Sequence, residues 1–281
     1  MPDKGPICIN LAEVLREKLG RRSRRVPRLL VRALEKIICQ DEMNAFLRKA
    51  YPREGAAFCD ALLDELDIRV DLRGEENLPT DGRAVFVCNH PLGGLDGIAI
   101  ISALTRIYGP GLRFVVNDML MAIGPLRGVF IPVNKHGSQS REGASTLDAV
   151  LQGDNPVVIF PAGLCSRRGK DGRIADLAWQ KMFVSKAVRS GRPVVPMYFS
   201  GRNSGSFYRF AALRKRLGIK LNIEMVRLPK EVFRARGSRF TLTCAPPIPP
   251  EALDARNAAA EASRIRELVY SLAQPSDTPR S

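Results

Sequence analysis

Residues 87–97 bring together two side-chain types that proton transfer requires. An apolar run ends at Cys88, and a glycine-rich turn containing His90 leads to Asp96 at the start of an expected helix. If the turn folds Asp96 back onto His90, the carboxylate holds one imidazole nitrogen and leaves the other free to act as a general base. The alternative is that His90 is an ordinary turn residue and Asp96 caps the helix. The chain has only two histidines, and this one follows a predicted strand, which favours the catalytic interpretation.

Two later loops also follow predicted strands and carry side chains suited to binding. The first, after the apolar run 157–160, places a glycine before two arginines, which suits capture of a phosphate or carboxylate through bidentate hydrogen bonds. The second, 200–204, adds further polar groups. Each loop has an alternative as an ordinary polar turn, and Cys165 in the first is a less favoured candidate nucleophile. The binding candidates in these loops are Gly163, Arg167, Arg168, Arg202 and Asn203.

The elements that must position these loops alternate between short apolar runs and helical segments from residue 84 onward. Such alternation predicts an α/β fold with a mixed, largely parallel sheet flanked by helices. In sheets of this kind ligands collect beyond the carboxyl ends of the strands, which is where the three loops fall. The predicted strands are 84–88, 113–116, 129–133, 157–160, 194–199, 221–226 and 240–244. The predicted helices are 97–108, 141–152, 177–190, 207–217 and 251–272.

Residues 1–74 have a different composition and are expected to form an N-terminal helical element. The apolar spacing predicts two amphipathic helices broken near Pro27, and a further helix at 58–66. Between Arg16 and Lys36 there are nine basic residues and two acidic ones. A basic, leucine-containing helix of this kind favours docking on an anionic membrane surface. The alternative is that its leucines pack on the rest of the chain and its arginines are merely solvated.

Composition restricts the remaining classes of function. The 281-residue chain has 44 Lys and Arg against 29 Asp and Glu, a formal charge of +15 that points to nucleic acid, an anionic membrane or acidic substrates. Only 6% of residues are aromatic and no nucleic-acid-binding signature is present, which argues against nucleic acid. The six cysteines lack metal-ligand spacing, so no metal is expected. The sequence shows no signal peptide and no run of the roughly 18 apolar residues that a membrane-spanning helix needs. We therefore expect a cytoplasmic protein, peripheral on the inner face of the cell membrane.

Four sequence blocks, taken together, resemble those of the glycerolipid (lysophosphatidic acid-type) acyltransferases. The first block runs from Asn89 to Asp96, and the others, in the family's order, are 128–133, 160–167 and 194–197. The resemblance covers about residues 75–250. It is closest to the hemolysin-like branch, which includes O-acyltransferases of ornithine and glycine lipids. The motifs that carry this likeness read Asn-His-Pro-Leu-Gly-Gly-Leu-Asp-Gly, Phe-Pro-Ala-Gly-Leu and Gly-Arg-Asn-Ser.

The resemblance implies a reaction and roles for particular residues. Residues 75–281 would form the acyltransferase domain, in which His90 removes the proton of an acceptor hydroxyl and Asp96 orients His90. The oxygen would attack an acyl-carrier-protein or coenzyme A thioester directly, so no further cofactor is expected, and acyl carrier protein is an expected partner. The acceptor would be a lyso-ornithine or lyso-glycine lipid, or lysophosphatidic acid, with its acidic head group on Arg167 and Arg168. Other substrate contacts would come from Asn89, Phe130, Ile131, Gly163, Arg202 and Asn203.

Two departures from the family pattern bear on these expectations. Five residues separate His90 from Asp96, where the family has four, and Ala162 stands where the third block usually has glutamate. Gly93 and Gly94 can absorb the extra residue because glycine permits the backbone conformations of a bulged turn. Ala162 puts a glycerol-3-phosphate type of acceptor in doubt and agrees with the ornithine- and glycine-lipid branch.

Other classes of function remain as alternatives. A lipid hydrolase or thioesterase would share the His/Asp pair, although the chain has no G-x-S-x-G nucleophile elbow. A basic nucleic-acid-binding protein is less favoured, for the reasons of composition given above. A pore-forming hemolysin, which the name of the branch suggests, would need membrane-spanning segments that the sequence does not show.

Overall fold

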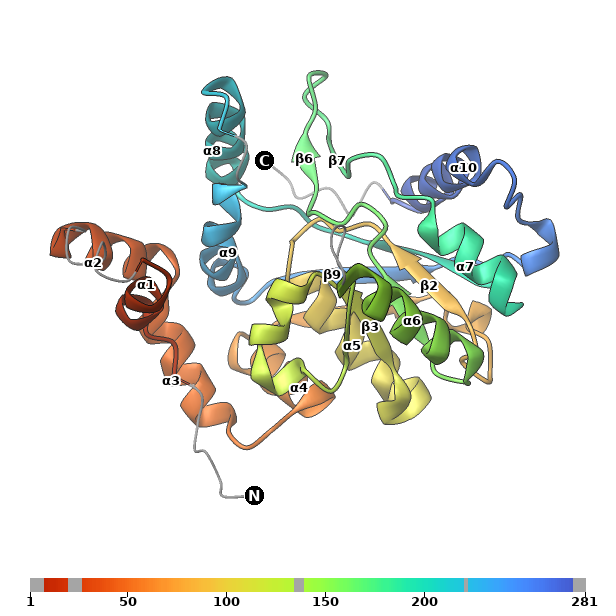
Figure 1. Ribbon diagram of the computed structural model, residues 1–281, viewed down its shortest axis with the longest axis horizontal. Helices are drawn as coiled ribbons and strands as arrows, with labels where there is room; N and C mark the ends of the chain where they lie inside the picture. The colour runs from red at the N-terminus through yellow and green to blue at the C-terminus, as the bar shows by residue number, and fades with distance from the viewer. Residues whose placement is uncertain (1–7, 20–26, 134–138, 220–221, 275–281) are drawn as a thin grey trace.

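The molecule is built on a seven-stranded sheet with the order β1-β9-β8-β2-β5-β3-β4 (Figure 1). The structure is a computed structural model that describes residues 8–19, 27–133, 139–219 and 222–274. Neighbouring strands are parallel except β8 and β9, so the sheet is mixed and largely parallel, as predicted. The strands are β1 (Arg69–Arg73), β2 (Val85–Cys88), β3 (Arg113–Val116), β4 (Phe130–Pro132), β5 (Val157–Ile159), β8 (Val194–Phe199) and β9 (Arg239–Cys244).

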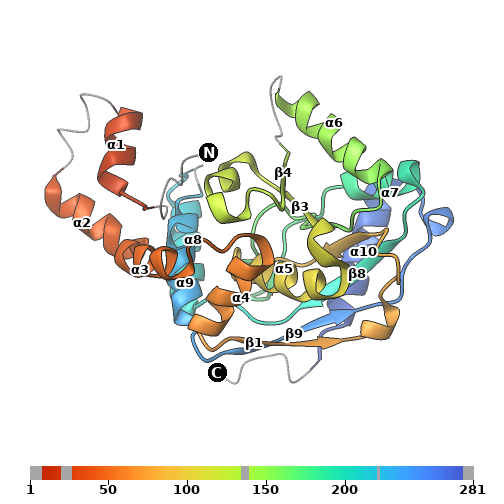
Figure 2. The same cartoon turned by 90° about the horizontal axis from the view of Figure 1, so that it is seen from below.

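Helices cover both faces of this sheet (Figure 2). In the central strand β2, Phe86 and Cys88 pack into one apolar cluster, whereas Val85 and Val87 pack into the other, because successive side chains of a strand point to opposite faces. One cluster includes residues of α4 and α5, and the second includes residues of α6, α7 and α10. The bounds of these helices are α4 (Gly55–Glu65), α5 (Leu95–Tyr108), α6 (Gln139–Gln152), α7 (Met182–Ser190) and α10 (Ala258–Ser271).

Three further helices, α1 (Leu11–Leu19), α2 (Arg28–Ile37) and α3 (Gln40–Ala50), extend from one end of the molecule (Figure 1). The two helices expected around Pro27 are present, although residues 20–26, with four arginines of the basic stretch, lie outside the described residues. α4 and β1 also lie within residues 1–74, but α4 packs in the apolar cluster of α5 and β1 pairs with β9 in the sheet. Within the described ranges, no helix combines the length and apolar character needed to cross a bilayer.

The prediction of a strand at 221–226 is wrong. The described part of this segment forms a 3-10 helix, η6 (Ile223–Arg227), that leads into α9 (Leu228–Arg234). Glu224 is fully buried here and bridges two arginines of other elements, and these tertiary contacts override the strand-like apolar pattern.

Other boundaries differ by less. β1 was not predicted, because its alternating charged residues gave no apolar run. α7 starts at Met182 instead of residue 177, and α10 starts at Ala258, after a short 3-10 turn, instead of residue 251. The remaining elements are α8 (Gly205–Arg216) and the small hairpin of β6 (Arg167–Arg168) and β7 (Ile174–Ala175).

Candidate active site

The loop between β2 and α5 brings His90 and Asp96 together. β2 ends at Cys88 and α5 begins at Leu95, so both side chains lie beyond the carboxyl end of a central strand. His90 Nδ1 lies 3.0 Å from Asp96 Oδ2. Asp96 is fully buried, and 14% of the His90 side chain is exposed. The structure therefore shows the pairing that the sequence predicted, with five residues between the partners.

Asp96 is held as an anion by backbone amides as well as by His90. Burial alone would raise the pKa of Asp96, but the charge and hydrogen bond of His90, together with backbone N–H donors, hold it below its ordinary value. Because the ionised carboxylate can only accept, Nδ1 carries the proton in the neutral form of the His90 ring, and Nε2 is then the nitrogen with the free lone pair. The four backbone donors are Leu92 and Gly93 to Oδ2, at 2.8 and 3.2 Å, and Gly94 and Gly97 to Oδ1, at 3.0 and 2.9 Å.

Gly93 gives this loop a backbone conformation that other residues rarely adopt. Its φ of +76° is in the left-handed region that favours glycine. A Cβ at this position would lie 2.9 Å from both Cys165 Cβ and Leu228 Cδ2. A larger residue would therefore be strained by its backbone conformation and would also displace the neighbouring loop and α9.

The ring and the backbone of His90 are both fixed. The imidazole stacks on Phe160, with the ring centroids 3.9 Å apart and the planes 19° from parallel. The backbone carbonyl of His90 accepts a 2.7 Å hydrogen bond from Ser166 N–H. Its backbone N–H donates to the carboxylate of Asp176, at 3.1 and 3.2 Å from the two oxygens. Residues that follow β5 therefore hold His90 in two ways, by stacking on its ring and by hydrogen bonds to its backbone N–H and carbonyl groups.

Asp176 is the centre of a second buried network. Its carboxylate accepts from Ser166 Oγ at 2.6 Å and from Trp179 Nε1 at 3.0 Å, in addition to His90. Its own N–H donates to Tyr270 Oη of α10 at 2.7 Å. Burial raises the pKa of Asp176, and these hydrogen bonds only partly oppose that effect. The network links the loop of His90 to the C-terminal helix.

Asn89 and Asn203 stabilise the loop from the other side. Asn89 is buried, and its amide bonds both backbone groups of Phe199 in β8, at 2.6 and 2.9 Å. Asn203 is also buried and its Nδ2 donates to the carbonyls of Pro91 and Leu92, at 3.3 and 3.4 Å. Both residues, predicted as substrate contacts, thus have their amides committed to the protein backbone around His90.

Arg167 lies beside the same loop in a buried charge cluster. Its Nη2 is 2.8 Å from Glu224 Oε1, and its Nη1 donates to the carbonyl of Cys165 at 2.6 Å. Arg214 of α8 approaches the other oxygen of Glu224 at 2.8 Å, so one buried carboxylate faces two guanidinium groups. The cluster carries a net charge of +1. Arg168 is exposed, with its guanidinium 5.9 Å from the centroid of Tyr208.

The remaining candidates differ in their surroundings. Gly163 follows β5 with a φ of +66°. Phe130 is half-buried at the end of the sheet, whereas Ile131 is buried in the apolar cluster of α6 and α7. Arg202 is exposed in the loop after β8. Cys165 is buried, which raises the pKa of its thiol to about 11 and leaves it protonated at neutral pH, unlike an activated nucleophile.

Comparison with known proteins identifies the family. A family model described as "Acyltransferase" matches residues 13–277, almost the whole chain. The chain belongs to this acyltransferase family. It is therefore an enzyme that transfers acyl groups, as the four sequence blocks predicted.

Individual relatives cover the chain nearly end to end. A protein of Phocaeicola vulgatus named lyso-glycine lipid O-acyltransferase is 42% identical, over 97% of this chain and 98% of the relative. A protein of the same name from Bacteroides thetaiotaomicron is 40% identical, over 97% of this chain and 100% of the relative. The crystal structure of the 1-acyl-sn-glycerophosphate (LPA) acyltransferase PlsC from Thermotoga maritima aligns with a TM-score of 0.46 and 15% identity, over 85% of this chain and 91% of that one.

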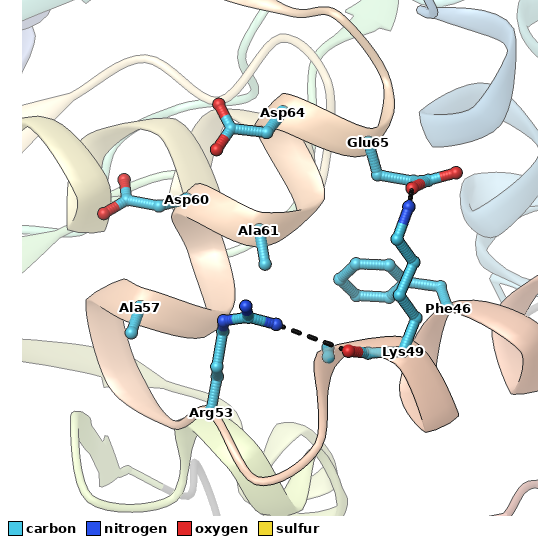
Figure 3. Close-up of a pocket in the computed structure, with 9 residues that line it drawn as sticks. Phe46, Lys49, Arg53, Ala57, Asp60, Ala61, Asp64 and Glu65 are labelled. Carbon is cyan, nitrogen blue, oxygen red and sulfur yellow. Dashed lines mark hydrogen bonds and ion pairs between the residues drawn. The ribbon is translucent and has the colours of Figure 1, made fainter.

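A groove elsewhere in the acyltransferase includes none of the candidate residues (Figure 3). It lies between α3 and α4, has a volume of about 490 Å³ and is lined by side chains such as Arg53, Asp60 and Asp64. Nothing in it resembles the paired base and acid of the β2–α5 loop. Nowhere in the described chain do three or more His, Cys, Asp or Glu side chains gather in a way that would hold a metal ion.

Sequence reasoning missed Asp176, Arg214 and Glu224. Asp176 contacts a residue 86 positions away, and Glu224 contacts one 57 positions away, so no local spacing connects them to the loops. The sequence signal available for Glu224 was a single acidic residue among apolar neighbours in a strongly basic chain. Predicting its burial required a correct assignment of the segment around it, which the apolar pattern did not provide.

Proposed function

We propose that this acyltransferase moves a fatty acyl group from a thioester to the hydroxyl of a lyso-glycine lipid. The observation that carries this proposal is the pairing of His90 with Asp96 in a chain more than 40% identical, along nearly its whole length, to a protein named for that reaction. Identity at this level across both full lengths supports a shared acceptor class. Lyso-ornithine lipid and lysophosphatidic acid are the competing acceptors.

His90 Nε2 acts as the general base in the proposed reaction. The acceptor hydroxyl gives its proton to Nε2 as its oxygen bonds to the thioester carbonyl carbon. The buried carboxylate of Asp96, 3.0 Å from Nδ1, balances the charge of the imidazolium. The tetrahedral intermediate then breaks its carbon–sulfur bond, and the departing thiolate takes the proton from Nε2. An acylated lipid and a free thiol result, and no acyl-enzyme is formed.

The acceptor's acidic group is proposed to meet the charge cluster of Arg167. Glycine that is joined to a lipid through its nitrogen keeps one free carboxylate. Glu224 cancels one of the two guanidinium charges, so the cluster of Arg167, Glu224 and Arg214 offers a net charge of +1. That charge suits a single carboxylate better than a phosphate, which carries up to two. The exposed Arg168 and Arg202, Gly163 and Phe130 stay candidate contacts.

The proposed lipid acceptor is also consistent with docking of the N-terminal helices on a membrane. Leu29 and Leu30 of α2 are 78% and 50% exposed, and Arg28, Arg32 and Lys36 lie on the same helix. Exposed leucines beside basic residues suit a helix that lies in the interface of an anionic bilayer. We propose that the enzyme works there, as a peripheral protein on the inner face of the cell membrane, with acyl carrier protein or coenzyme A delivering the acyl group.

The purified enzyme can be tested with synthetic lyso-glycine lipid and either acyl-acyl carrier protein or acyl-coenzyme A. Thiol release and lipid mass spectrometry are followed together, with His90→Ala as the inactive control and lysophosphatidic acid as a competing acceptor. Acylated glycine lipid formed in step with thiol supports the proposal. Thiol release with free fatty acid and no acylated lipid would establish the hydrolase alternative, and preferential acylation of lysophosphatidic acid would refute the assigned acceptor.

A further inference from the structure

The α8–α9 region has a surface of one charge sign. Between residues 205 and 234 the two acidic side chains, Glu224 and Glu231, are both buried and bonded to other groups. The exposed charged residues described in this stretch are therefore all basic. They are Arg209, Lys215, Arg216, Lys230 and Arg234.

Large aliphatic side chains protrude from the same surface. Leu213 and Leu217, one helical turn apart, are 52% and 65% exposed. Three more large aliphatic side chains, those of Ile219, Ile223 and Val226, are also exposed. We call these five residues, with Arg209, Lys215 and Arg216, the α8 tip surface. Five exposed large aliphatic side chains within 14 residues of chain are uncommon on a surface that meets only water.

The orientation of α8 places Arg209, Leu213 and Arg216 on its outer side. Phe207, Ala211 and Arg214 follow each other at four- and three-residue spacing and face the protein. Residues 209, 213 and 216 consequently lie on the opposite side of α8. The buried bridge from Arg214 through Glu224 to Arg167 ties α8 and η6 to the hairpin of β6 and β7.

The position of the tip connects it to both the site and the N-terminal helices. Arg167, beside the His90 loop, bonds Glu224 and lies 5.6 Å from the ring centroid of Phe207 in α8. Figures 1 and 2 show α8 and α9 at the same end of the molecule as α1, α2 and α3. Lys230 of α9 is close enough for its charge to act on the Cys39 thiol between α2 and α3, whose pKa is raised mainly by burial.

We propose that the α8 tip surface is a second membrane contact, which inserts its leucines into an anionic bilayer while its basic side chains meet the lipid phosphates. Figure 1 shows α8 rising away from the sheet. Exposed leucines at the end of such a helix suit insertion into a fluid bilayer better than contact with the fixed surface of an acidic carrier protein. The inference rests on the proposed function only in that a lipid acceptor must reach His90. Two contacts at one end would hold the site at the membrane surface.

Binding of the full chain to vesicles tests this proposal. One set of vesicles contains equal parts of phosphatidylglycerol and phosphatidylcholine, and the other contains phosphatidylcholine alone. Leu213→Ser with Leu217→Ser should weaken binding to the anionic vesicles roughly 25-fold, about fivefold for each half-exposed leucine. Lys215→Ala with Arg216→Ala should weaken it by a similar factor at low salt, about fivefold per charge, and much less at high salt.

Matched controls remove equivalent groups from other elements. Ile107→Ser removes an exposed aliphatic side chain from α5, and Lys181→Ala with Arg256→Ala removes two exposed charges near α7 and α10. These variants should bind as the wild type does. Thermal unfolding of every variant checks that the fold is kept. We expect that it is, because the substituted side chains are exposed.

The outcomes separate this inference from the proposed function. Wild-type binding by both tip variants, or an equal loss in the controls, would overturn the second membrane contact. So would tip variants that bind vesicles normally but lose binding to acyl carrier protein. With lyso-glycine lipid in detergent micelles the tip variants should keep wild-type turnover, and with the acceptor in anionic vesicles their rate should fall. Absence of turnover in the wild type would refute the proposed acceptor and leave the vesicle result valid.

Discussion

Replacing Asp96 by asparagine removes one negative charge and turns one oxygen acceptor into an amide donor. The carboxylate now accepts five hydrogen bonds, three at Oδ2, including that from His90, and two at Oδ1. Asparagine can keep a carbonyl oxygen at only one of the two positions. If the oxygen stays toward His90, the N–H groups of Gly94 and Gly97 face an amide that cannot accept from them.

The cost follows from these two lost acceptors. An unsatisfied, partly buried N–H costs about 1–3 kcal/mol, so the two together should destabilise the fold by about 2–6 kcal/mol. At roughly 2–4 °C per kcal/mol, the Tm should fall by about 4–24 °C. The imidazolium also loses its counter-charge, and with it general-base efficiency, so kcat should fall at least about 100-fold. Asp96→Asn should therefore reduce stability and activity together.

The pH dependence of the stability difference gives a second check. Because the folded-state pKa of Asp96 is below its ordinary value of 3.8, its contribution is complete above that pH. It is lost as pH falls through the lower folded-state value. The difference in unfolding free energy between wild type and Asp96→Asn should be largest near neutral pH and should shrink below about pH 4.

Urea unfolding across this pH range and steady-state acyl transfer near neutral pH provide the measurements. Asp60→Asn is a matched control, because Asp60 bonds Ser102 and Arg106 of α5 without touching the His90 loop. The double variant His90→Ala with Asp96→Asn should be no less active than His90→Ala alone, since Asp96 acts through His90. Independent, multiplicative losses would refute this coupling, and a fully active Asp96→Asn would refute the assigned pair altogether.

Four other substitutions have definite expected outcomes in kinetic assays and thermal melts. His90→Ala should lower kcat by about 10²–10⁴-fold and should also lower the Tm, because the buried carboxylate of Asp96 loses its imidazole partner; retained activity would exclude His90 as the base. Arg167→Ala should raise the acceptor KM more than tenfold, about 1.5–3 kcal/mol, without raising the donor KM. Asp176→Asn should lower kcat more than it raises either KM, because Asp176 positions the backbone of His90. Cys165→Ser should keep nearly full turnover, and its loss would restore the nucleophile hypothesis.

The sequence was sufficient to predict six of the seven strands and the contact between His90 and Asp96, because both depend on local order. Strands such as β2 and β8 are short apolar runs, buried on both faces, and their ends mark where a site can form. The pairing of His90 with Asp96 closes within one loop, so its residues are neighbours in sequence as well as in space. β1 gave no such signal, because its charged residues alternate at the edge of the sheet.

What supports the pair was not predictable in the same way. His90 is stacked on Phe160, and its peptide is held by Asp176, which in turn bonds Tyr270 of the last helix. These partners come from three separate segments and meet only when β5, the loop before α7, and α10 have packed against β2. The amide of Asn89, predicted as a substrate contact, instead bonds Phe199 in β8. Residue type alone does not distinguish a side chain that binds substrate from one that positions the base.

The same distinction decides how Arg167 is understood. From the sequence, two adjacent arginines after a strand suggested equivalent ligands for an acidic head group. Of these two, only Arg167 is tied to a buried carboxylate, while Arg168 is exposed with its guanidinium 5.9 Å from the ring centroid of Tyr208. A guanidinium held by Glu224 has lost most of its rotamer freedom before any ligand arrives, so less entropy is lost when it binds an anion. The buried glutamate therefore lowers the charge offered to the acceptor while it fixes the direction in which that charge is presented.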